Sequence, residues 1–260
     1  MPASPLTPVV PEPEAPPKRA YQLYWQLDVP LLVSAGVLSL GRSFRTAKGS
    51  APAYCTTTPE GCDKSDLAAW DRPYAGTYEP RWNTVSDLGA GVLLVAPIPL
   101  LSADEGFLSA LNDSVVVYES TVTAVALSAL ATLSTSRARP FVYGTSAPES
   151  VRKSPDGALS FISGHTTASF ALSTSLFWTV ERRHHGSAYT WAVFGVGTAV
   201  ATTVGISRVK AGKHFPSDVV AGALVGASIG TLIPALHDTP VRVTPEVDKE
   251  RASLSLSGIF

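Results

Sequence analysis

The segment Ser207–Asp218 concentrates reactive side chains between two apolar stretches of the 260-residue sequence. Arg208 and His214 are separated by five residues, and Asp218 follows four positions after the histidine. Pro216 favours the first turn of a helix, so we expect His214 just ahead of a helix N-terminus, where Asp218 can reach back to one ring nitrogen. An imidazole oriented by a carboxylate, beside an arginine, suits attack on a phosphoryl group. A polar loop followed by a helix cap is the simpler alternative.

Polar residues at two other boundaries of apolar segments can complete an anion site. Arg139 follows one apolar segment, and Ser163, Gly164 and His165 open another. Arginine binds phosphate through paired N–H donors, and the amides of a helix N-terminus attract anions. With two histidines, one imidazole can attack phosphorus while the other protonates the leaving oxygen. Because these side chains supply the positive charge themselves, we expect neither a metal ion nor another cofactor.

Six apolar blocks must position these residues. Charged residues make up only 16% of the chain. Runs of roughly 20 apolar residues are long enough to cross a bilayer, which favours membrane helices over the core of a soluble helical protein. The net charge of −1, without a basic stripe interleaved with aromatics, excludes a typical nucleic-acid-binding protein. The blocks cover residues 28–41, 86–104, 114–134, 166–180, 188–207 and 218–236.

Six spans place the reactive residues together on one side of the membrane. The loop with Cys55 and Cys62, the Arg139 loop and the Ser207–Asp218 segment then face one compartment. The termini and the Arg182-Arg183 pair face the other compartment. The positive-inside rule, applied to Arg182-Arg183 together with Lys18 and Arg19, identifies that compartment as the cytoplasm, although the long first loop also carries Arg and Lys. The two cysteines therefore lie on an oxidising side and can form a disulfide, with two free thiols as the alternative.

The rest of the chain divides around this helical region. Residues 1–20 form a Pro-rich tail that we expect to be disordered, and residues 238–260 form a polar C-terminal tail. The domain between them, 21–237, has its core at 85–236 and a long polar loop at 42–85. Glu119 interrupts an apolar block and is either functional or near the membrane interface.

Three fragments of this sequence resemble the signatures of the type 2 phosphatidic acid phosphatase family. That family shares its catalytic core with bacterial acid phosphatases and vanadium haloperoxidases. Arg139-Pro140 is similar to the end of the first signature, Ser163-Gly164-His165 to the second, and Ser207-Arg208 with His214 and Asp218 to the third. The resemblance covers about residues 85–236 and implies an all-α, six-helix membrane bundle with the active site at one end.

The resemblance also implies a role for each matching residue. His214 is the nucleophile that forms a phosphohistidine, Asp218 is its partner, and His165 is the general acid. The residues that hold the phosphate are Arg139, Arg208, Ser163 and Gly164. No metal ligand is implied.

One position departs from the family pattern. The first signature begins with a lysine, and Thr132 stands in its place. Loss of one charge-assisted donor weakens transition-state stabilisation by roughly 2–4 kcal/mol, by analogy with an oxyanion-hole donor. Other cations that can supply the missing charge are Arg137, Lys153, Lys210 and Lys213.

The predicted function is hydrolysis of a membrane lipid phosphate at the outer face of a bacterial-type inner membrane. Phosphatidic acid-like lipids, polyprenyl pyrophosphate and lipid A phosphate all fit, and the sequence does not select among them or predict an oligomeric state. The alternatives are a soluble or membrane-attached non-specific acid phosphatase and, because of Thr132, an inactive phosphate-binding relative. A haloperoxidase is a more distant possibility.

Overall fold

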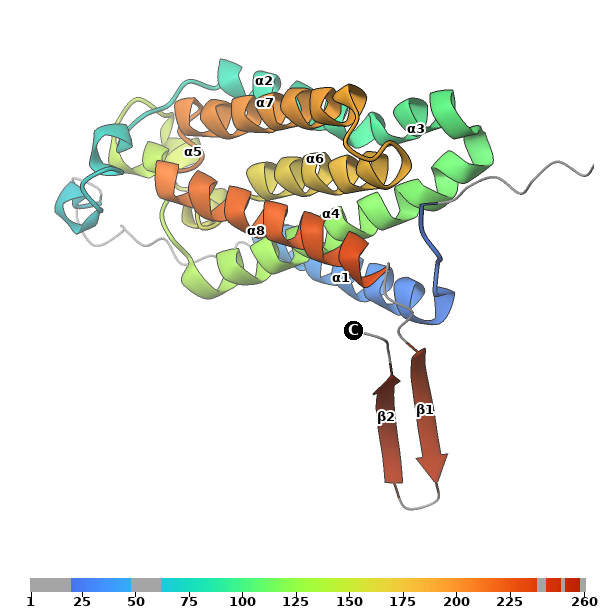
Figure 1. Ribbon diagram of the computed structural model, residues 1–260. Coiled ribbons are helices and arrows are strands. Elements are labelled where there is room, and N and C mark those ends of the chain that lie inside the picture. The colour runs from blue at the N-terminus through green and yellow to red at the C-terminus, as the bar shows by residue number, and fades with distance from the viewer. Residues whose placement is uncertain (1–19, 48–61, 238–241, 249–250, 258–260) are drawn as a thin grey trace, which may run out of the picture.

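The computed structural model describes residues 20–47, 62–237, 242–248 and 251–257 (Figure 1). Seven of its α-helices build the bundle, and a short helix, α5 (Glu149–Arg152), lies in a connecting loop. The bundle helices are α1 (Trp25–Ala47), α2 (Arg81–Val95), α3 (Pro97–Glu105), α4 (Phe107–Thr135), α6 (Gly164–Arg183), α7 (Ala188–Lys210) and α8 (Pro216–Leu236). Four 3-10 turns lie in the connections: η1 (Lys64–Asp66), η2 (Arg72–Tyr74), η3 (Pro140–Tyr143) and η4 (Pro155–Ala158).

The predicted helical bundle is confirmed, and each of the six apolar blocks falls on helix. The second block divides between α2 and α3, because Pro97 lacks the amide that would continue the hydrogen-bond ladder. Ala96 ends one helix and precedes the next, so the two follow each other with a single residue between them. Six apolar blocks therefore correspond to seven bundle helices.

Among the described residues, fewer helices than the predicted six have the length and apolar composition expected of a membrane span. Four helical segments are long and apolar enough to cross a membrane: Arg81–Asp104, Phe107–Tyr143, Ala188–Lys210 and Pro216–Leu236. Trp25–Leu40, within α1, is a shorter apolar stretch. Helix α6 is not among these segments, because its sequence is rich in serine and threonine and therefore less apolar.

Helix α6 lies in the middle of the bundle, against α2, α4, α7 and α8 (Figure 1). A helix enclosed by other helices need not be apolar, provided that its polar groups have partners. The hydroxyls of Thr167 and Thr179 donate to carbonyls one turn earlier, and Ser175 contacts Ser120 of α4 at 3.1 Å. The low hydropathy of α6 therefore reflects its central place.

Helices α6 and α8 approach closely along a row of glycines. Gly222, Gly226 and Gly230 recur at every fourth position, so they line one face of α8. A Cβ added at Gly226 would stand 2.3 Å from the carbonyl oxygen of Thr167, which shows backbone packed against backbone. This contact sets the distance between the start of α6 and the start of α8.

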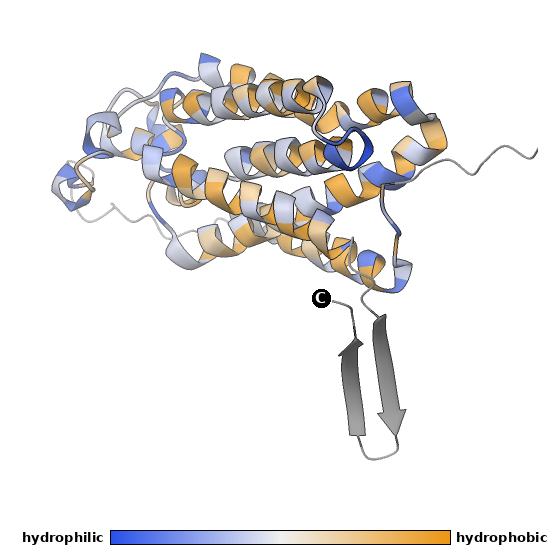
Figure 2. Ribbon diagram, viewed as in Figure 1, coloured by the Kyte–Doolittle hydropathy of each residue, from blue (hydrophilic) through white to orange (hydrophobic). Residues whose placement is uncertain are grey.

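Hydrophilic residues collect at the two ends of the helices, and the middle of the bundle is largely apolar (Figure 2). At the end where α6 meets α7, Arg183 forms an ion pair with the buried Asp113, and His184 contacts Asp104. The opposite end carries the residues singled out for phosphate chemistry. Such a banded surface fits a protein that spans a membrane.

The chain ends in an element that the sequence did not predict. Strands β1 (Arg242–Asp248) and β2 (Arg251–Ser257) pair as an antiparallel hairpin, which Figure 1 shows projecting from the helices. The predicted N-terminal tail lies outside the described residues, apart from Ala20. Cys62 is disulfide-bonded, while its predicted partner Cys55 lies outside the described residues.

Candidate active site

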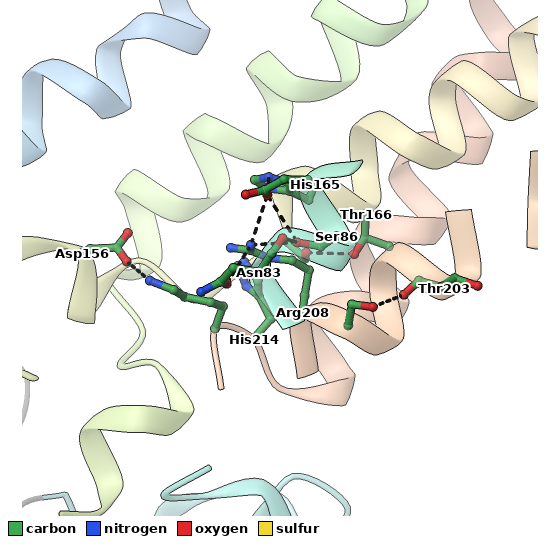
Figure 3. Close-up of polar contacts among 12 residues, drawn as sticks. Asn83, Ser86, Asp156, His165, Thr166, Thr203, Arg208 and His214 are labelled. Atoms are coloured by element: carbon green, nitrogen blue, oxygen red, sulfur yellow. Dashed lines mark hydrogen bonds and ion pairs between the residues drawn. The ribbon is translucent and has the colours of Figure 1, made fainter. Parts of the chain in front are cut away.

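Five helix ends meet where the predicted phosphate residues lie. They are the starts of α2, α6 and α8 and the ends of α4 and α7. Figure 3 shows His165, Arg208 and His214 in one cluster, although they come from α6, α7 and the turn before α8. Two backbone hydrogen bonds connect these segments. The amide of His214 donates to the carbonyl of Arg208 at 3.3 Å, and the amide of Ser163 donates to the backbone carbonyl of Asp218 at 3.1 Å.

The ring of His214 is held by two contacts that define its tautomer. Nδ1 lies 2.6 Å from the carbonyl oxygen of Ser160, which can only accept a hydrogen bond. Nε2 lies 3.4 Å from Nη1 of Arg139, which can only donate. Both contacts assign the proton to Nδ1 and leave a lone pair on Nε2. The buried ring therefore presents a nucleophilic nitrogen beside a guanidinium.

The predicted hydrogen bond between Asp218 and His214 is wrong. The Asp218 carboxylate accepts from Nη1 of Arg137 at 2.5 Å, from the Ser160 hydroxyl at 2.5 Å and from the Phe215 amide at 2.8 Å. Asp218 is fully buried in the first turn of α8, and the helix start directs its side chain back onto its own N-cap. Asp218 therefore acts on the imidazole indirectly, by fixing the residue whose carbonyl orients the ring.

Arg139 is a buried cation with several fixed partners. Its guanidinium donates to the backbone oxygen of Asp156 at 2.8 Å, to the Asp156 carboxylate at 2.8 Å and to the Lys213 carbonyl at 2.7 Å. The ammonium of Lys213 lies 3.0 Å from the other oxygen of that carboxylate. Two cations thus share one carboxylate, which leaves a net positive charge next to His214.

His165 faces the site from the start of α6, as predicted. Its Nε2 lies 3.0 Å from Oδ1 of Asp87, and its side chain is 41% exposed, so solvent and substrate can reach it. Arg208 lies 4.0 Å from the same carboxylate oxygen and donates to Asn83 at 3.3 Å and to Ser86 at 3.2 Å. The first turns of α2 therefore link the second imidazole to the second arginine.

Ser163 occupies the predicted N-cap position of α6, but its hydroxyl does not cap the helix. It contacts the hydroxyl of Thr166 at 2.8 Å, one turn into α6. The first amides of a helix have no intrahelical acceptor, so Gly164 and His165 present their N–H groups at this mouth. Such amides are suited to bind the oxygens of a phosphoryl group.

The turn between α7 and His214 depends on Gly212. Its φ of +74° is a conformation that L-residues rarely adopt, and an added Cβ would lie 1.9 Å from the Thr77 carbonyl oxygen. The Gly212 carbonyl also accepts from the Phe141 amide at 3.2 Å. This glycine therefore sets the path of the chain into His214.

The four cations considered as substitutes for the missing lysine have different surroundings. Arg137 is fixed between Asp71 and Asp218, Lys153 forms an exposed pair with Glu149, and Lys210 lies over the ring of Trp82. Lys213 is the remaining candidate of the four, because it shares the Asp156 carboxylate with Arg139. Thr132 itself is fully buried, and its hydroxyl donates to the Ser128 carbonyl at 2.8 Å.

The sequence analysis missed several residues of this site. Nothing in their local sequence marks Asp156 or the Ser160 carbonyl, because their role depends on where the loop folds back. Asn83, Ser86 and Asp87 did carry a signal, since polar residues at this spacing share one face at the start of an apolar helix. Within the described part of the chain, a cluster of three metal-ligating side chains occurs elsewhere, at Asp28, Glu119 and His237.

The sequence of this chain is similar to that of known proteins. The sequence profile described as the PAP2 superfamily matches residues 114–242, a segment that contains all seven predicted site residues. The chain belongs to the PAP2 superfamily. A lipid A 1-phosphatase from Porphyromonas gingivalis is 42% identical over 83 residues, which are 31% of this chain and 17% of that protein.

Two solved structures resemble the fold at low sequence identity. One is a transmembrane PAP2 type phosphatidylglycerolphosphate phosphatase from Bacillus subtilis, with 20% identity and a TM-score of 0.45 over 83% of this chain and 97% of that chain. The other is Aquifex aeolicus LpxE, with 20% identity and a TM-score of 0.43 over 65% of this chain and 96% of that chain.

Proposed function

We propose that this PAP2 protein hydrolyses a phosphate monoester or pyrophosphate of a membrane lipid through a phosphohistidine on His214. The observation that carries the proposal is the pair of contacts on the His214 ring. Nδ1 donates its hydrogen bond to the Ser160 carbonyl, so Nε2 carries the lone pair and faces the Arg139 guanidinium. A neutral, oriented imidazole beside a cation is what nucleophilic attack on an anionic phosphoryl group needs.

The reaction proceeds in two displacement steps. Nε2 of His214 forms a bond to phosphorus as the bond to the leaving oxygen breaks, and His165 gives that oxygen a proton. His165, now neutral, then takes a proton from a water molecule that attacks the phosphohistidine. The P–N bond breaks, inorganic phosphate leaves, and both imidazoles return to their starting states.

The positive groups around His214 offset the charge of the transferring phosphoryl group. Arg139 and Arg208 supply two guanidinium groups, and the first amides of α6 supply a third set of donors. We assign to Lys213 the charge that a lysine at position 132 supplies in the family. Its ammonium lies 3.0 Å from Asp156, whose carboxylate also holds Arg139.

The acyl part of the substrate is expected to lie in a groove between α2, α3 and α7. The groove has a volume of about 920 Å³, and its lining is almost entirely apolar. Asp87 lines it as well, and the same carboxylate contacts His165. A lipid tail in the groove therefore brings the head group to the imidazoles, and a soluble phosphomonoester lacks this contact.

Location follows from the same arrangement. The reactive end carries the loop with Cys62, and the opposite end carries Arg182 and Arg183. With the Arg182-Arg183 end in the cytoplasm, the active site faces the periplasm or the exterior of a bacterial-type inner membrane. Carbonate extraction of membranes tests the soluble alternative, because an integral membrane protein stays in the pellet.

Purified protein in detergent should release phosphate from at least one of phosphatidic acid, a polyprenyl pyrophosphate or lipid A. His214→Ala is expected to reduce kcat by at least about 10³-fold, as removal of a nucleophile does in other covalent enzymes. His185→Ala is the matched control, because that side chain is 93% exposed on the far loop. Equal activity of His214→Ala and wild type rejects the mechanism.

The inactive alternative makes the opposite prediction at position 132. If the chain only binds phosphate, the wild type shows no turnover on the panel and Thr132→Lys creates it. If Lys213 already supplies the charge, the wild type turns over and Lys213→Met lowers kcat. Acid-labile, base-stable labelling by a ³²P-substrate, absent in His214→Ala, identifies the phosphohistidine directly.

A further inference from the structure

We propose that Asp28, Glu119 and His237 form a binding site for one divalent transition-metal ion, such as Zn²⁺, at the end of the bundle opposite His214. The three residues come from the first turn of α1, the middle of α4 and the C-cap of α8. One ligating atom from each lies within 4.8 Å of the others. An imidazole with two carboxylates is a ligand set that Zn²⁺ uses in proteins.

The side chains are buried and directed at one another. Their exposed fractions are 4% for Asp28, 2% for Glu119 and 7% for His237. Nε2 of His237 lies 3.4 Å from Oδ1 of Asp28 and 3.3 Å from Oε2 of Glu119. Neither this Nε2 nor this Oε2 makes a hydrogen bond within the described residues. Two buried polar atoms thus point into the cluster without a hydrogen-bond partner.

The other atoms of the cluster are already fixed by the backbone. Nδ1 of His237 lies 3.0 Å from the Ile233 carbonyl oxygen, so Nδ1 must donate and carries the proton. Oδ2 of Asp28 accepts from the Tyr24 amide at 2.7 Å, which leaves Oδ1 toward the imidazole. A carbonyl on one ring nitrogen that directs the other toward a metal is the usual outer-shell arrangement.

The charge of the cluster favours a divalent cation. Two buried carboxylates carry a charge of −2, and protonation of His237 leaves a net −1 away from water. A buried uncompensated charge is costly. A divalent ion bound by a neutral imidazole and two carboxylates brings the net charge to zero and uses the two atoms that lack hydrogen bonds.

The expected effect of the ion is on stability rather than on turnover. The site joins the beginning of α1 to α4 and to the end of α8, and the Tyr21 ring packs edge-on against His237 with ring centroids 6.1 Å apart. His214 precedes α8 and His237 follows it, so the full helix separates the two sites. Removing the ion should therefore lower Tm and leave kcat of the folded enzyme unchanged.

The test measures metal content and thermal stability of the full chain in detergent. After equilibration with Zn²⁺ or Mn²⁺ and removal of free ion, the wild type should retain about one equivalent per chain, and EDTA should lower its Tm by several degrees. Glu119→Gln and His237→Gln should lose the equivalent and the EDTA response. His184→Gln is the matched control, since that imidazole pairs with Asp104 at the exposed end of α6.

Two results overturn the proposal. One is a wild type that holds no more metal than Glu119→Gln, and the other is a Tm that neither Zn²⁺, Mn²⁺ nor EDTA changes. Either outcome makes the cluster an ion-pair network only. The EDTA experiment on the wild type needs no variant, so it remains informative even if a variant fails to fold. Asp28→Asn provides a third substitution in the cluster.

Discussion

His214 is oriented by a main-chain oxygen. Nδ1 donates to the Ser160 carbonyl, and the Ser160 hydroxyl donates to the Asp218 carboxylate. Asp218 therefore reaches the imidazole only through Ser160, whose carbonyl fixes the tautomer. A carbonyl also fixes the tautomer, but it brings no full negative charge to stabilise an imidazolium. Asp218 is accordingly a positioning residue whose charge offsets that of Arg137.

Asp218→Asn should lower stability and activity together. Breaking a buried ion pair costs about 3–5 kcal/mol, because Arg137 is left without one of its anions. Tm should therefore fall clearly. Any loss of kcat should come only from displacement of Ser160, whose carbonyl orients His214. Ser160→Ala keeps the carbonyl and serves as the control, with an expected loss in kcat below about 10-fold. A loss near 10⁴-fold in Asp218→Asn at unchanged Tm would instead indicate direct orientation of the imidazole.

If Lys213 supplies charge to the reaction as proposed, activity should have an alkaline limit. Burial lowers the pKa of the Lys213 ammonium, and the nearby Asp156 carboxylate only partly opposes this. The positive charge is present below that lowered pKa and is lost as the pH rises through it, so kcat/KM should fall there. Lys213→Arg keeps the charge, because guanidinium does not titrate in this range. In this variant the fall of kcat/KM should move to higher pH. An identical pH profile for the two proteins contradicts this role.

At the scale of elements, the contact of α6 with α8 sets the geometry of the site. The glycine face of α8 lets the two backbones approach, and the starts of both helices then present Ser163 and Asp218 within one hydrogen bond of each other. The polar residues of α6 are compatible with this place because hydroxyls such as those of Thr167 and Thr179 find acceptors within the bundle.

Gly226→Ala should destabilise the protein by roughly 1–3 kcal/mol, the usual cost of overpacking a tight interface. The added methyl meets the Thr167 carbonyl oxygen at 2.3 Å, and this backbone atom cannot move aside as a flexible side chain could. Gly195→Ala in α7 is the matched control, since nothing lies within 4 Å of its added Cβ. Thermal unfolding of the two variants in the same detergent measures the difference, and equal Tm values contradict the close packing.

At the scale of the whole molecule, the bundle exposes many large apolar side chains, among them Leu88, Val92 and Leu224. Hydrophilic residues gather toward the ends of the helices (Figure 2). The groove of α2, α3 and α7 interrupts one flank and extends to Asp87. Under the proposed function, a lipid remains in the bilayer while its head group reaches the site, so we expect chain length to be part of substrate recognition.

Val92→Trp should reduce kcat/KM for long-chain substrates by about 10-fold, equivalent to losing the burial of roughly two methylene groups. The indole fills part of the groove that Val92 lines. Activity on a short-chain analogue should stay near the wild-type value, because its head group uses the same imidazoles and arginines. Val220→Trp, at a half-exposed position of α8 outside the groove lining, is the control. A uniform loss on both substrates contradicts a tail-binding role.

The sequence by itself determined the helices and the end of the bundle where the polar residues gather. Apolar length and helix-start residues are local properties, so the six blocks, the Pro216 helix start and the placement of His165, Arg208 and His214 could be read directly. The central position of α6 could not be read from hydropathy alone. It depends on the neighbouring helices that enclose its polar hydroxyls.

Tertiary structure decided which atoms meet. Ser160 lies 54 residues before His214, and no local rule says that its carbonyl, rather than Asp218, faces the ring. Asp28, Glu119 and His237 are far apart along the chain and become neighbours only when α1, α4 and α8 pack. Spacing within one helix fixes a face, but hydrogen-bond partners between helices depend on the register and distance at which the backbones pack.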